Sequence, residues 1–474
     1  MRPIETKHVV VTFAFLTSTA FFLWQHTTGV GWDFAAYSLN ARYWFQGGTY
    51  FQALRPPLAP LLIGLFGLVS RAWAEFLFIA AGSFLFAFSS VKLAQKYDLP
   101  ADLLYIASLT PFVMIEGFKN GTELFCLALL ELVLVYLGTA AAPLFLGLAI
   151  LARYPAAAFA VLLLFTKDFR SSVRDLLIVA AVCAPWLIYS QIVFGHWAAS
   201  FMDSYAMNMK FRGYLASPFR LADVGKVGTW LLPLALAGVF LWIRKRSHGK
   251  MPDPRYWPIV VFLGLAVLSY ARIQQKQARY LFDLTLPLAV LSAAALAQLP
   301  KKAWRMAAAA GLVVLCAGSI GFAWRKNPDS VRLDDVRVYQ RVLAEVGPQL
   351  GDCRLGTNAW DFINYFGRPA EPFPMNELIE TRLAEGYRLL LFKNLAEPKL
   401  SRAVLDRLPI LAETSAYMLI GRPGPCAPAR PCVYRYLDLK KESMLKKGRR
   451  DFPDTLLKLI FYKDKPEQGN TAVW

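Results

Sequence analysis

The chain has 474 residues, 56% of them hydrophobic and only 18% charged, and its formal net charge is +19. Soluble globular domains are usually about 45–50% apolar and about 25% charged, so the composition excludes an ordinary soluble protein. A nucleic-acid-binding protein would gather its cations in a soluble domain, so that class is disfavoured as well. The positive charge fits either the usual excess of Lys and Arg on cytoplasmic loops or attraction to anionic lipid head groups and phosphates.

Apolar runs of roughly 17–22 residues, the length that crosses the hydrocarbon core of a bilayer, recur between residues 9 and 324. The first run, 9–24, could be a secretory signal peptide. No small-residue cleavage pattern follows it, so we interpret it as a retained helix that leaves the N-terminus in the cytoplasm. The sequence thus predicts an all-α polytopic membrane domain over residues 1–324, with about eleven transmembrane pieces.

The orientation of these pieces follows from basic clusters, which are enriched in cytoplasmic loops. Clusters of this kind occur at 167–170, 244–248 and 301–305. The segments predicted on the outer side are the loops 31–58, 195–226 and 273–279 and everything after residue 324. The pieces predicted to span the membrane after the first helix are 75–93, 101–118, 122–138, 143–152, 156–165, 173–194, 227–243, 256–272, 280–297 and 304–324.

The short apolar run 58–69 has two interpretations. If it crosses the membrane, Lys92 and Lys96 lie outside, against the positive-inside rule. If it only dips into the membrane, both lysines lie inside, and we favour this because the run is short for a span. A break is also predicted at Arg153-Tyr154-Pro155, because proline removes a helix donor and disfavours helix in the residue before it.

The tail from residue 325 to 474 is less apolar than the rest of the chain. It contains a strand-like run at 387–392 and helix-like runs at 334–346 and 376–385. About 150 residues suffice for one small domain, so the tail is predicted to form an extracytoplasmic α/β domain.

The cysteines and histidines do not form a pattern typical of a metal site. Cys353, Cys426 and Cys432 lie in the tail and allow one disulfide, but their spacing does not determine which pair forms it. A bound metal ion therefore stays an open question at this point.

The loop 31–58 combines many aromatic side chains with a single carboxylate, Asp33. An ionisable group at membrane depth is costly and suggests function, so we interpret this loop as an in-plane shelf that carries the catalytic acid. Asp33 could also serve as the N-cap of an in-plane helix, and the two roles are compatible. Glu123, in the next predicted outer loop, is a second candidate acid, with a helix-dipole contact as the alternative.

A basic cluster on the predicted outer side runs against the positive-inside rule. It consists of Arg272, Lys276 and Arg279. A phosphate ligand would account for it, and a surface anchor to lipid head groups is the alternative. The same phosphate-binding role is considered for Arg153, at the proline break, and for Arg55, beside two prolines.

Several of these residues recur in a fixed order. An acid in the first outer loop is followed by a Tyr four residues later, a Gly-rich turn, a basic residue before Pro-Pro, an acid in the second outer loop and a K..RY…P run. The residues concerned are Asp33, Tyr37, Gly47-Gly48, Arg55-Pro56-Pro57-Leu58, Glu123, Lys276, Arg279, Tyr280 and Pro287. This order resembles the GT-C superfamily of polyprenyl-phosphate-sugar-dependent glycosyltransferases, in particular the group of the lipid A aminoarabinose transferase and the protein O-mannosyltransferases.

The resemblance covers most of residues 9–300, and two positions depart from it. Phe34 stands where the family often has a second acid, and Glu123 stands where Asp is common. Both departures weaken the expectation of a bound metal, so the cofactor stays unknown and a divalent cation stays open.

The resemblance implies a GT-C-like, inverting glycosyltransferase of the plasma (inner) membrane that moves a sugar from a polyprenyl-phosphate donor to a lipid, glycan or protein on the outer face. Its partners would be the lipid donor, membrane lipids and the acceptor, and not nucleic acid. Asp33 would be the general base, with Glu123 as the second catalytic acid. The donor phosphate would be held by Arg55, Arg153, Arg272, Lys276 and Arg279. The sugar or acceptor would be contacted by Trp32, Tyr37, Trp44 and Tyr280.

Two other classes of protein remain as alternatives. A lipid-linked-sugar transporter or flippase would be expected to have matched internal repeats, and no repeat is visible. A non-catalytic membrane scaffold that presents the tail domain would leave the aromatic loop and the outer basic cluster unexplained.

Overall fold

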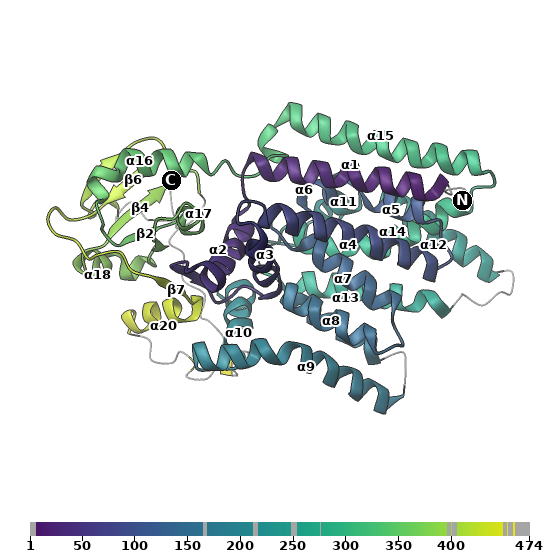
Figure 1. Ribbon diagram of the computed structural model, residues 1–474, viewed down its shortest axis with the longest axis horizontal. Coiled ribbons are helices and arrows are strands. Elements are labelled where there is room, and N and C mark those ends of the chain that lie inside the picture. Colours follow the sequence, from purple (N-terminus) through teal and green to yellow (C-terminus); the bar gives the residue numbers. More distant parts are fainter. Residues whose placement is uncertain are drawn as a thin grey trace.

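The computed structural model describes residues 6–164, 168–211, 217–247, 254–274, 276–395, 400, 405–448, 453 and 458–459. It consists of a long helical bundle and a smaller C-terminal domain at one end of it (Figure 1). Helix α1 (Thr6–Thr28) begins at the opposite end of the bundle. The first helix and the C-terminal domain therefore mark the two ends of the molecule.

The bundle is that of a multi-pass membrane protein. Among the described residues, 5 helices are long and apolar enough to cross a bilayer, and up to 6 if the pair α11–α12, bent by 88°, is one span. The long segments are Val9–Thr28, Ala74–Lys96, Phe169–Phe194, Ala278–Ala297 and Lys302–Lys326. The shorter apolar helices are Leu58–Val69, Ala141–Ala152, Tyr154–Leu164 and Trp257–Ala271. The full number of about eleven pieces stays a prediction.

The remaining elements of the bundle connect or cap these spans. Their bounds are α5 (Ala101–Ser108), α6 (Pro111–Glu116), α7 (Glu123–Val135), α10 (Ala199–Tyr205), η2 (Ala206–Lys210), α11 (Leu221–Gly228), α12 (Leu231–Ser247), η4 (Pro254–Tyr256), α13 (Trp257–Arg272), η5 (Ala278–Leu284), α14 (Thr285–Ala297) and η6 (Pro328–Ser330). In this numbering α3, α4, α8, η1, α9 and α15 are Leu58–Val69, Ala74–Lys96, Ala141–Ala152, Tyr154–Leu164, Phe169–Phe194 and Lys302–Lys326.

One predicted span is interrupted. A single helix over 101–118 was expected, but the chain forms α5 and α6 with a break at Leu109-Thr110. Pro111 cannot donate a helix hydrogen bond, and the Thr110 hydroxyl accepts one from the Val113 amide, so a new helix begins there.

The predicted break at Arg153 is confirmed. Arg153 is extended, with φ −153° and ψ 119°, and separates α8 from the 3-10 helix η1. Pro155 follows in the first turn of η1. The extended backbone at the break is accompanied by an ion pair between the Arg153 side chain and Glu123, the first residue of α7.

The loop after α1 forms a short helix at the junction of the two parts. Helix α2 (Trp32–Gln46) lies between the bundle and the C-terminal domain and packs on α3 and α17 (Figure 1). It ends at Gly47, whose φ of 68° is left-handed and suits glycine. The strand β1 (Tyr50–Gln52) follows. Gly31 is the N-cap of α2, so Asp33 belongs to its first turn and is not the cap.

The C-terminal domain contains a five-stranded sheet with strand order β3-β2-β4-β6-β5. Strand β2 is parallel to β3 and β4, and β6 is antiparallel to β4 and β5. The predicted strand at 387–392 is β4. The elements of this domain are α16 (Arg337–Leu350), β2 (Leu355–Thr357), α17 (Trp360–Tyr365), β3 (Glu371–Pro372), η7 (Asn376–Leu378), α18 (Ile379–Ala384), β4 (Arg388–Phe392), β5 (Ile410–Glu413), β6 (Tyr417–Ile420), β7 (Cys432–Tyr434) and α20 (Tyr436–Lys446).

The end of the chain returns to the membrane domain. Strand β7 pairs in parallel with β1, so the first loop and the tail share a two-stranded sheet. The next helix, α20, begins on the carboxylate of Asp203 in α10, which accepts from the amides of Tyr436 and Leu437 at 2.9 and 2.7 Å. Two separate contacts thus fix the tail to the loops near α2.

A polar cluster between α1, α4 and α17 provides a third connection. Glu75 accepts hydrogen bonds from the hydroxyl of Tyr365 at 2.9 Å and pairs with Nε2 of His26 at 2.8 Å. The guanidinium of Arg42 lies 4.4 Å from the Tyr365 ring centroid and donates to its backbone carbonyl at 2.7 Å. These contacts bury the junction between the two parts of the molecule.

A disulfide joins Cys353 and Cys426, which are 73 residues apart, and Cys432 is free. We expect Cys353→Ser to destabilise the C-terminal domain by about 2–5 kcal/mol, because the open chain regains loop entropy in its unfolded state. The midpoint of thermal unfolding of the purified protein should fall, and Cys432→Ser should leave it nearly unchanged. Equal effects of the two variants would contradict this pairing.

Candidate active site

The centre of the site is Asp33, in the first turn of α2, whose two carboxylate oxygens each accept from a different arginine. Oδ1 lies 2.8 Å from Nη1 of Arg55, and Oδ2 lies 2.9 Å from Nη1 of Arg279. The side chains of Asp33, Arg55 and Arg279 are 20%, 11% and 21% exposed, so all three are mostly shielded from solvent. Charge-assisted hydrogen bonds are shorter and stronger than neutral ones, and these two hold the carboxylate in one orientation.

Arg55 is positioned by the strand that precedes it. The side-chain oxygen of Gln52 accepts from Nε of Arg55. The backbone of Gln52 is in turn fixed by Asn40 of α2, which donates to its carbonyl at 2.9 Å and accepts from its amide at 2.8 Å. The Tyr37 ring lies 5.8 Å from the guanidinium. Asp33, Tyr37 and Arg55, which follow one another in the predicted order of motifs, therefore form one cluster near the start of α2.

Arg279 comes from the first turn of η5, between α13 and α14. Its Nε donates to the side chain of Gln277 at 2.8 Å, and its Nη2 donates to the hydroxyl of Tyr280 at 3.3 Å. Together with the bond to Asp33, these contacts use all three nitrogen atoms of the guanidinium. Arg279 thus ties the late helices to α2.

A second ion pair lies next to the first. Nη1 of Arg153 is 2.7 Å from Oε1 of Glu123, and the Glu123 side chain is only 4% exposed. No other ion pair or hydrogen bond of the Arg153 guanidinium is seen in the described part of the chain, and an arginine side chain has five N–H donors. Arg153 therefore has donors left for a ligand.

The loop before α7 shapes the space between the two ion pairs. The Thr122 hydroxyl is 3.4 Å from that of Tyr37. Gly121 has a φ of 103°, and a Cβ atom there would approach Phe34 and Tyr37 to 3.1 Å. A side chain at this position would push α2 away from Glu123.

Electrostatics keep Asp33 ionised. Burial alone would raise its pKa, but Arg55 and Arg279 outweigh burial and hold the pKa at about 2, below the ordinary value of 3.8. A carboxylate with this pKa is a poor proton acceptor at neutral pH. For the Tyr37 hydroxyl burial prevails, so its pKa is raised and the hydroxyl stays protonated.

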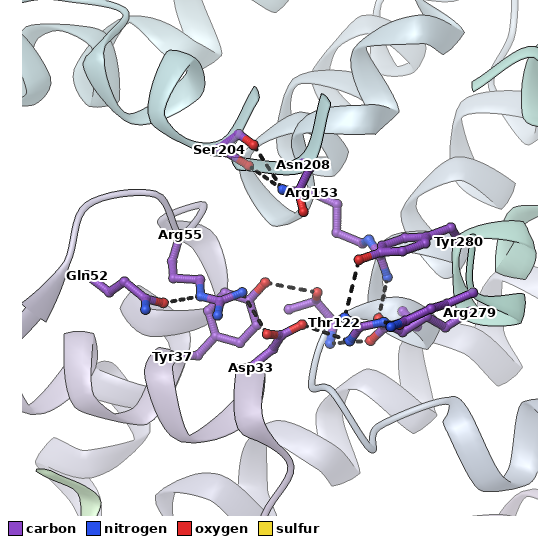
Figure 2. A network of polar contacts seen from close by, with 12 residues as sticks. Asp33, Tyr37, Gln52, Arg55, Thr122, Arg153, Ser204, Asn208, Arg279 and Tyr280 are labelled. Carbon is purple, nitrogen blue, oxygen red and sulfur yellow. Dashed lines mark hydrogen bonds and ion pairs between the residues drawn. The ribbon is translucent and has the colours of Figure 1, made fainter. Parts of the chain in front are cut away.

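Figure 2 shows that these side chains converge from α2, the loop after β1, the break after α8 and η5. Ser204 and Asn208 lie on the side of the network opposite Asp33. Asn208 belongs to the π-helical turn η2 and donates to the carbonyl of Ser204 at 2.9 Å. Single π turns are frequent at functional sites.

Three of the predicted site residues lie in other environments. The ammonium of Lys276 donates to backbone carbonyls at the end of α13, those of Tyr270 at 2.9 Å and Ala271 at 2.8 Å. Trp32 packs edge-on against Trp360 of the C-terminal domain, at 4.8 Å between ring centroids.

Trp44, the third, is at the far end of α2 and donates to the hydroxyl of Tyr189 at 2.9 Å. The last residue of α13 is Arg272, and its side chain lies outside the described part of the structure. The structure thus brings Asp33, Tyr37, Arg55, Glu123, Arg153, Arg279 and Tyr280 together.

An apolar pocket lies between α8, α9 and α10. It is formed by side chains of these helices next to Tyr154, which follows Arg153. Its lining includes Ile150, Leu151, Cys183, Trp186, Leu187 and Phe201. The pocket is thus lined by residues that flank the break at Arg153 in the sequence, and none of the three arginines lines it.

Sequence reasoning missed the neutral and acidic residues that support the site. Gln52 and Gln277 accept hydrogen bonds from Arg55 and Arg279, Thr122 lies within hydrogen-bond distance of Tyr37, and Asp361 of α17 interacts electrostatically with Arg55. The only available signal was their closeness in sequence to Arg55, Glu123 and Arg279. For Asp361 there was none, because the contact depends on how the tail folds back.

The arrangement does not define a metal site. No group of three His, Cys, Asp or Glu side chains that could hold an ion occurs among the residues searched, which are the described ones. Both oxygens of Asp33 contact arginines. The chemistry available to the described residues is anion binding and proton transfer.

Comparison with known proteins supports the fold. No protein-family model and no curated protein matches the sequence. The chain resembles the crystal structure of ArnT from Cupriavidus metallidurans bound to undecaprenyl phosphate, with a TM-score of 0.54 and 14% identity over 89% of this chain and 100% of that one. It also resembles the crystal structure of ArnT from Cupriavidus metallidurans in the apo state, with a TM-score of 0.52 and 13% identity over 87% of this chain and 99% of that one.

The likeness extends over nearly the whole chain and confirms a mostly helical, ArnT-like architecture with a small C-terminal sheet region. The chain has the fold of ArnT. At this level of identity the comparison establishes architecture, and the chemistry must be argued from the site.

We expect Glu123→Gln to destabilise the protein by about 3–5 kcal/mol, because it leaves the Arg153 guanidinium buried without its partner. Glu413→Gln is a matched control. Glu413 pairs with Lys393 at the same 2.7 Å, but its side chain is 45% exposed, and exposed pairs contribute at most about 1 kcal/mol. Thermal unfolding midpoints in detergent would separate the two, and similar midpoints would contradict the structural role of Glu123.

Proposed function

We propose that this protein is an integral-membrane glycosyltransferase that transfers a sugar from a polyprenyl-phosphate-linked donor to an acceptor on the outer face of the membrane. The observation that carries the proposal is the pairing of Asp33 with Arg55 and Arg279. The two arginines can bind an anion, and the carboxylate between them can accept a proton. The ArnT-like fold and the apolar pocket between α8, α9 and α10 support a lipid-linked substrate.

The donor phosphate would bind to the arginines. Arg153 has free donors, and Arg279 can exchange its bond to Asp33 for a bond to phosphate, since guanidinium binds both anions in the same geometry. ArnT was crystallised with undecaprenyl phosphate, a ligand of the same chemical class. The arginines would also stabilise the charge that develops on the phosphate as it leaves the sugar.

Binding of the donor would convert Asp33 into a base. An arginine that turns to the phosphate no longer lowers the pKa of Asp33, so burial would then raise that pKa toward the range of a useful general base. The carboxylate would take the proton of an acceptor hydroxyl, and the hydroxyl oxygen would attack the anomeric carbon. The bond from that carbon to the phosphate oxygen breaks, with inversion, and the electron pair stays on the phosphate.

The tail domain would lie on the outer side, with the N-terminus in the cytoplasm. The basic clusters near residues 168, 246 and 302 favour this orientation. Residues 325–474 would form the extracytoplasmic domain and cover α2. The acceptor would reach Asp33 from the side of Ser204 and Asn208.

We expect Asp33→Asn to lower sugar transfer by at least about 100-fold, because Asn cannot accept the proton of the acceptor. Transfer of label from a polyprenyl-phosphate-linked sugar to the lipid, glycan or protein fraction of membranes would be measured. Asp98→Asn is the control, since Asp98 is 73% exposed, pairs with Arg255 and has a φ of 54° that Asn tolerates. Sugar transfer by Asp33→Asn close to that of the wild type would contradict the role of Asp33 as the base, whereas absence of transfer by the wild type itself would favour the transporter alternative.

We expect Arg279→Gln to weaken binding of undecaprenyl phosphate roughly ten- to hundredfold, the effect of losing a hydrogen bond to a charged group. Lys276→Gln should change the dissociation constant little, because the Lys276 ammonium already bonds to carbonyls of α13. Dissociation constants can be measured in nanodiscs by native mass spectrometry. A large effect of Lys276→Gln instead would restore this lysine to the phosphate site that the sequence predicted.

A further inference from the structure

A carboxyl group of the C-terminal domain is buried beside the active site without an ion pair to a described cation. Asp361 lies in the first turn of α17 and is 0% exposed. Its oxygens form no hydrogen bond of ordinary geometry with a described residue, although the side chains of Tyr50 and Gln52 are near enough to act on it as donors. Helix α17 packs on α2, which carries Asp33 (Figure 1).

The neighbours of Asp361 connect it to the site. Arg55 is the cation that acts on it most strongly, and the Asp33 carboxylate opposes that attraction. From β1 the hydroxyl of Tyr50 and the side chain of Gln52 interact with it, and from β7 so does the thiol of Cys432. Burial keeps the hydroxyl and the thiol protonated, because it raises the pKa of each well above neutral.

Arg55 therefore acts on two acids, but more strongly on Asp33 than on Asp361. Arg55 forms an ion pair at 2.8 Å with Asp33 and a side-chain hydrogen bond to Gln52, while Asp361 has no ion pair with a described cation. A buried carboxylate without a partner is costly, and such a group usually takes up a proton. Burial raises the pKa of Asp361 to about 7, with Arg55 pulling it the other way.

We propose that Asp361 is a positioning residue that keeps a proton while the lipid phosphate is bound, and so leaves the charge of Arg55 to Asp33 and the phosphate. The inference rests on the proposed function, because it concerns the same phosphate. It adds a residue of the tail domain to the active site. Asp361 does not touch the substrate in this arrangement and acts through Arg55.

The proposed role of Asp361 makes donor binding dependent on pH. The folded pKa of Asp361 is raised, so the group is protonated below about 7 and ionises above it. Ionisation adds a negative charge beside Arg55, which draws the guanidinium away from Asp33 and repels the phosphate. Donor binding should therefore be tight at acidic pH and weaken as the pH rises through 7.

The test uses a ligand whose own charge is constant. Undecaprenyl methyl phosphate is a phosphodiester and lacks the second ionisation, near pH ~6, of a phosphate monoester. Its dissociation constant would be measured for the full-length protein in nanodiscs from about pH 5.5 to 8.5. For the wild type we expect a weakening on the order of tenfold, as for one unit charge added about 10 Å from the ligand at an effective dielectric constant of ~20.

Asp361→Asn should bind tightly at every pH, because its amide cannot ionise. Asp335→Asn is the control in the same domain; Asp335 is exposed and pairs with Arg337 at 2.8 Å, so this variant should keep the pH dependence of the wild type. The same pH dependence in Asp361→Asn as in the wild type, or a flat wild-type profile, would overturn the role of Asp361 and leave donor binding intact. Absence of binding by the wild type at every pH would overturn the proposed donor, and this inference with it.

Discussion

The site depends on one carboxylate held between two arginines that are far apart in the chain. Asp33 and Arg279 are separated by 246 residues, and their 2.9 Å bond joins α2 to the late helices. Arg55 adds the loop after β1 to the same point. A buried ion costs too much without partners, so the positions of α2, β1 and η5 are coupled through this carboxylate.

The C-terminal domain is part of this arrangement. Strand β7 pairs with β1, which is followed by Arg55, and Asp203 of α10 starts α20 by accepting two backbone bonds. Glu75 joins α17 to the first helices. The tail therefore contacts the segments that bear the arginines, which explains how an acid as remote in sequence as Asp361 can influence the electrostatics of the site.

Much of the site could be predicted because its residues obey rules that act locally. The proline after Arg153 marks a break, and cations on the outer side of the membrane need a reason such as an anionic ligand. The environment of other residues depends on tertiary packing, which local sequence patterns do not reveal. Trp32 looked like a sugar-stacking residue, but α17 covers it, and Lys276 is used to cap α13. Asp361 gave no signal, because its contact forms only when the tail folds back.

The two opposing influences on Asp33 suggest why the acid and the cations belong together. In the free protein the arginines make the carboxylate a weak base, so it stays ionised at neutral pH. Under the proposed function an incoming phosphate would compete for the same guanidinium groups, and burial would then raise the basicity of Asp33. The strength of the base would thereby be linked to occupancy of the donor site, and an acceptor hydroxyl would be activated only when a sugar is present to receive it.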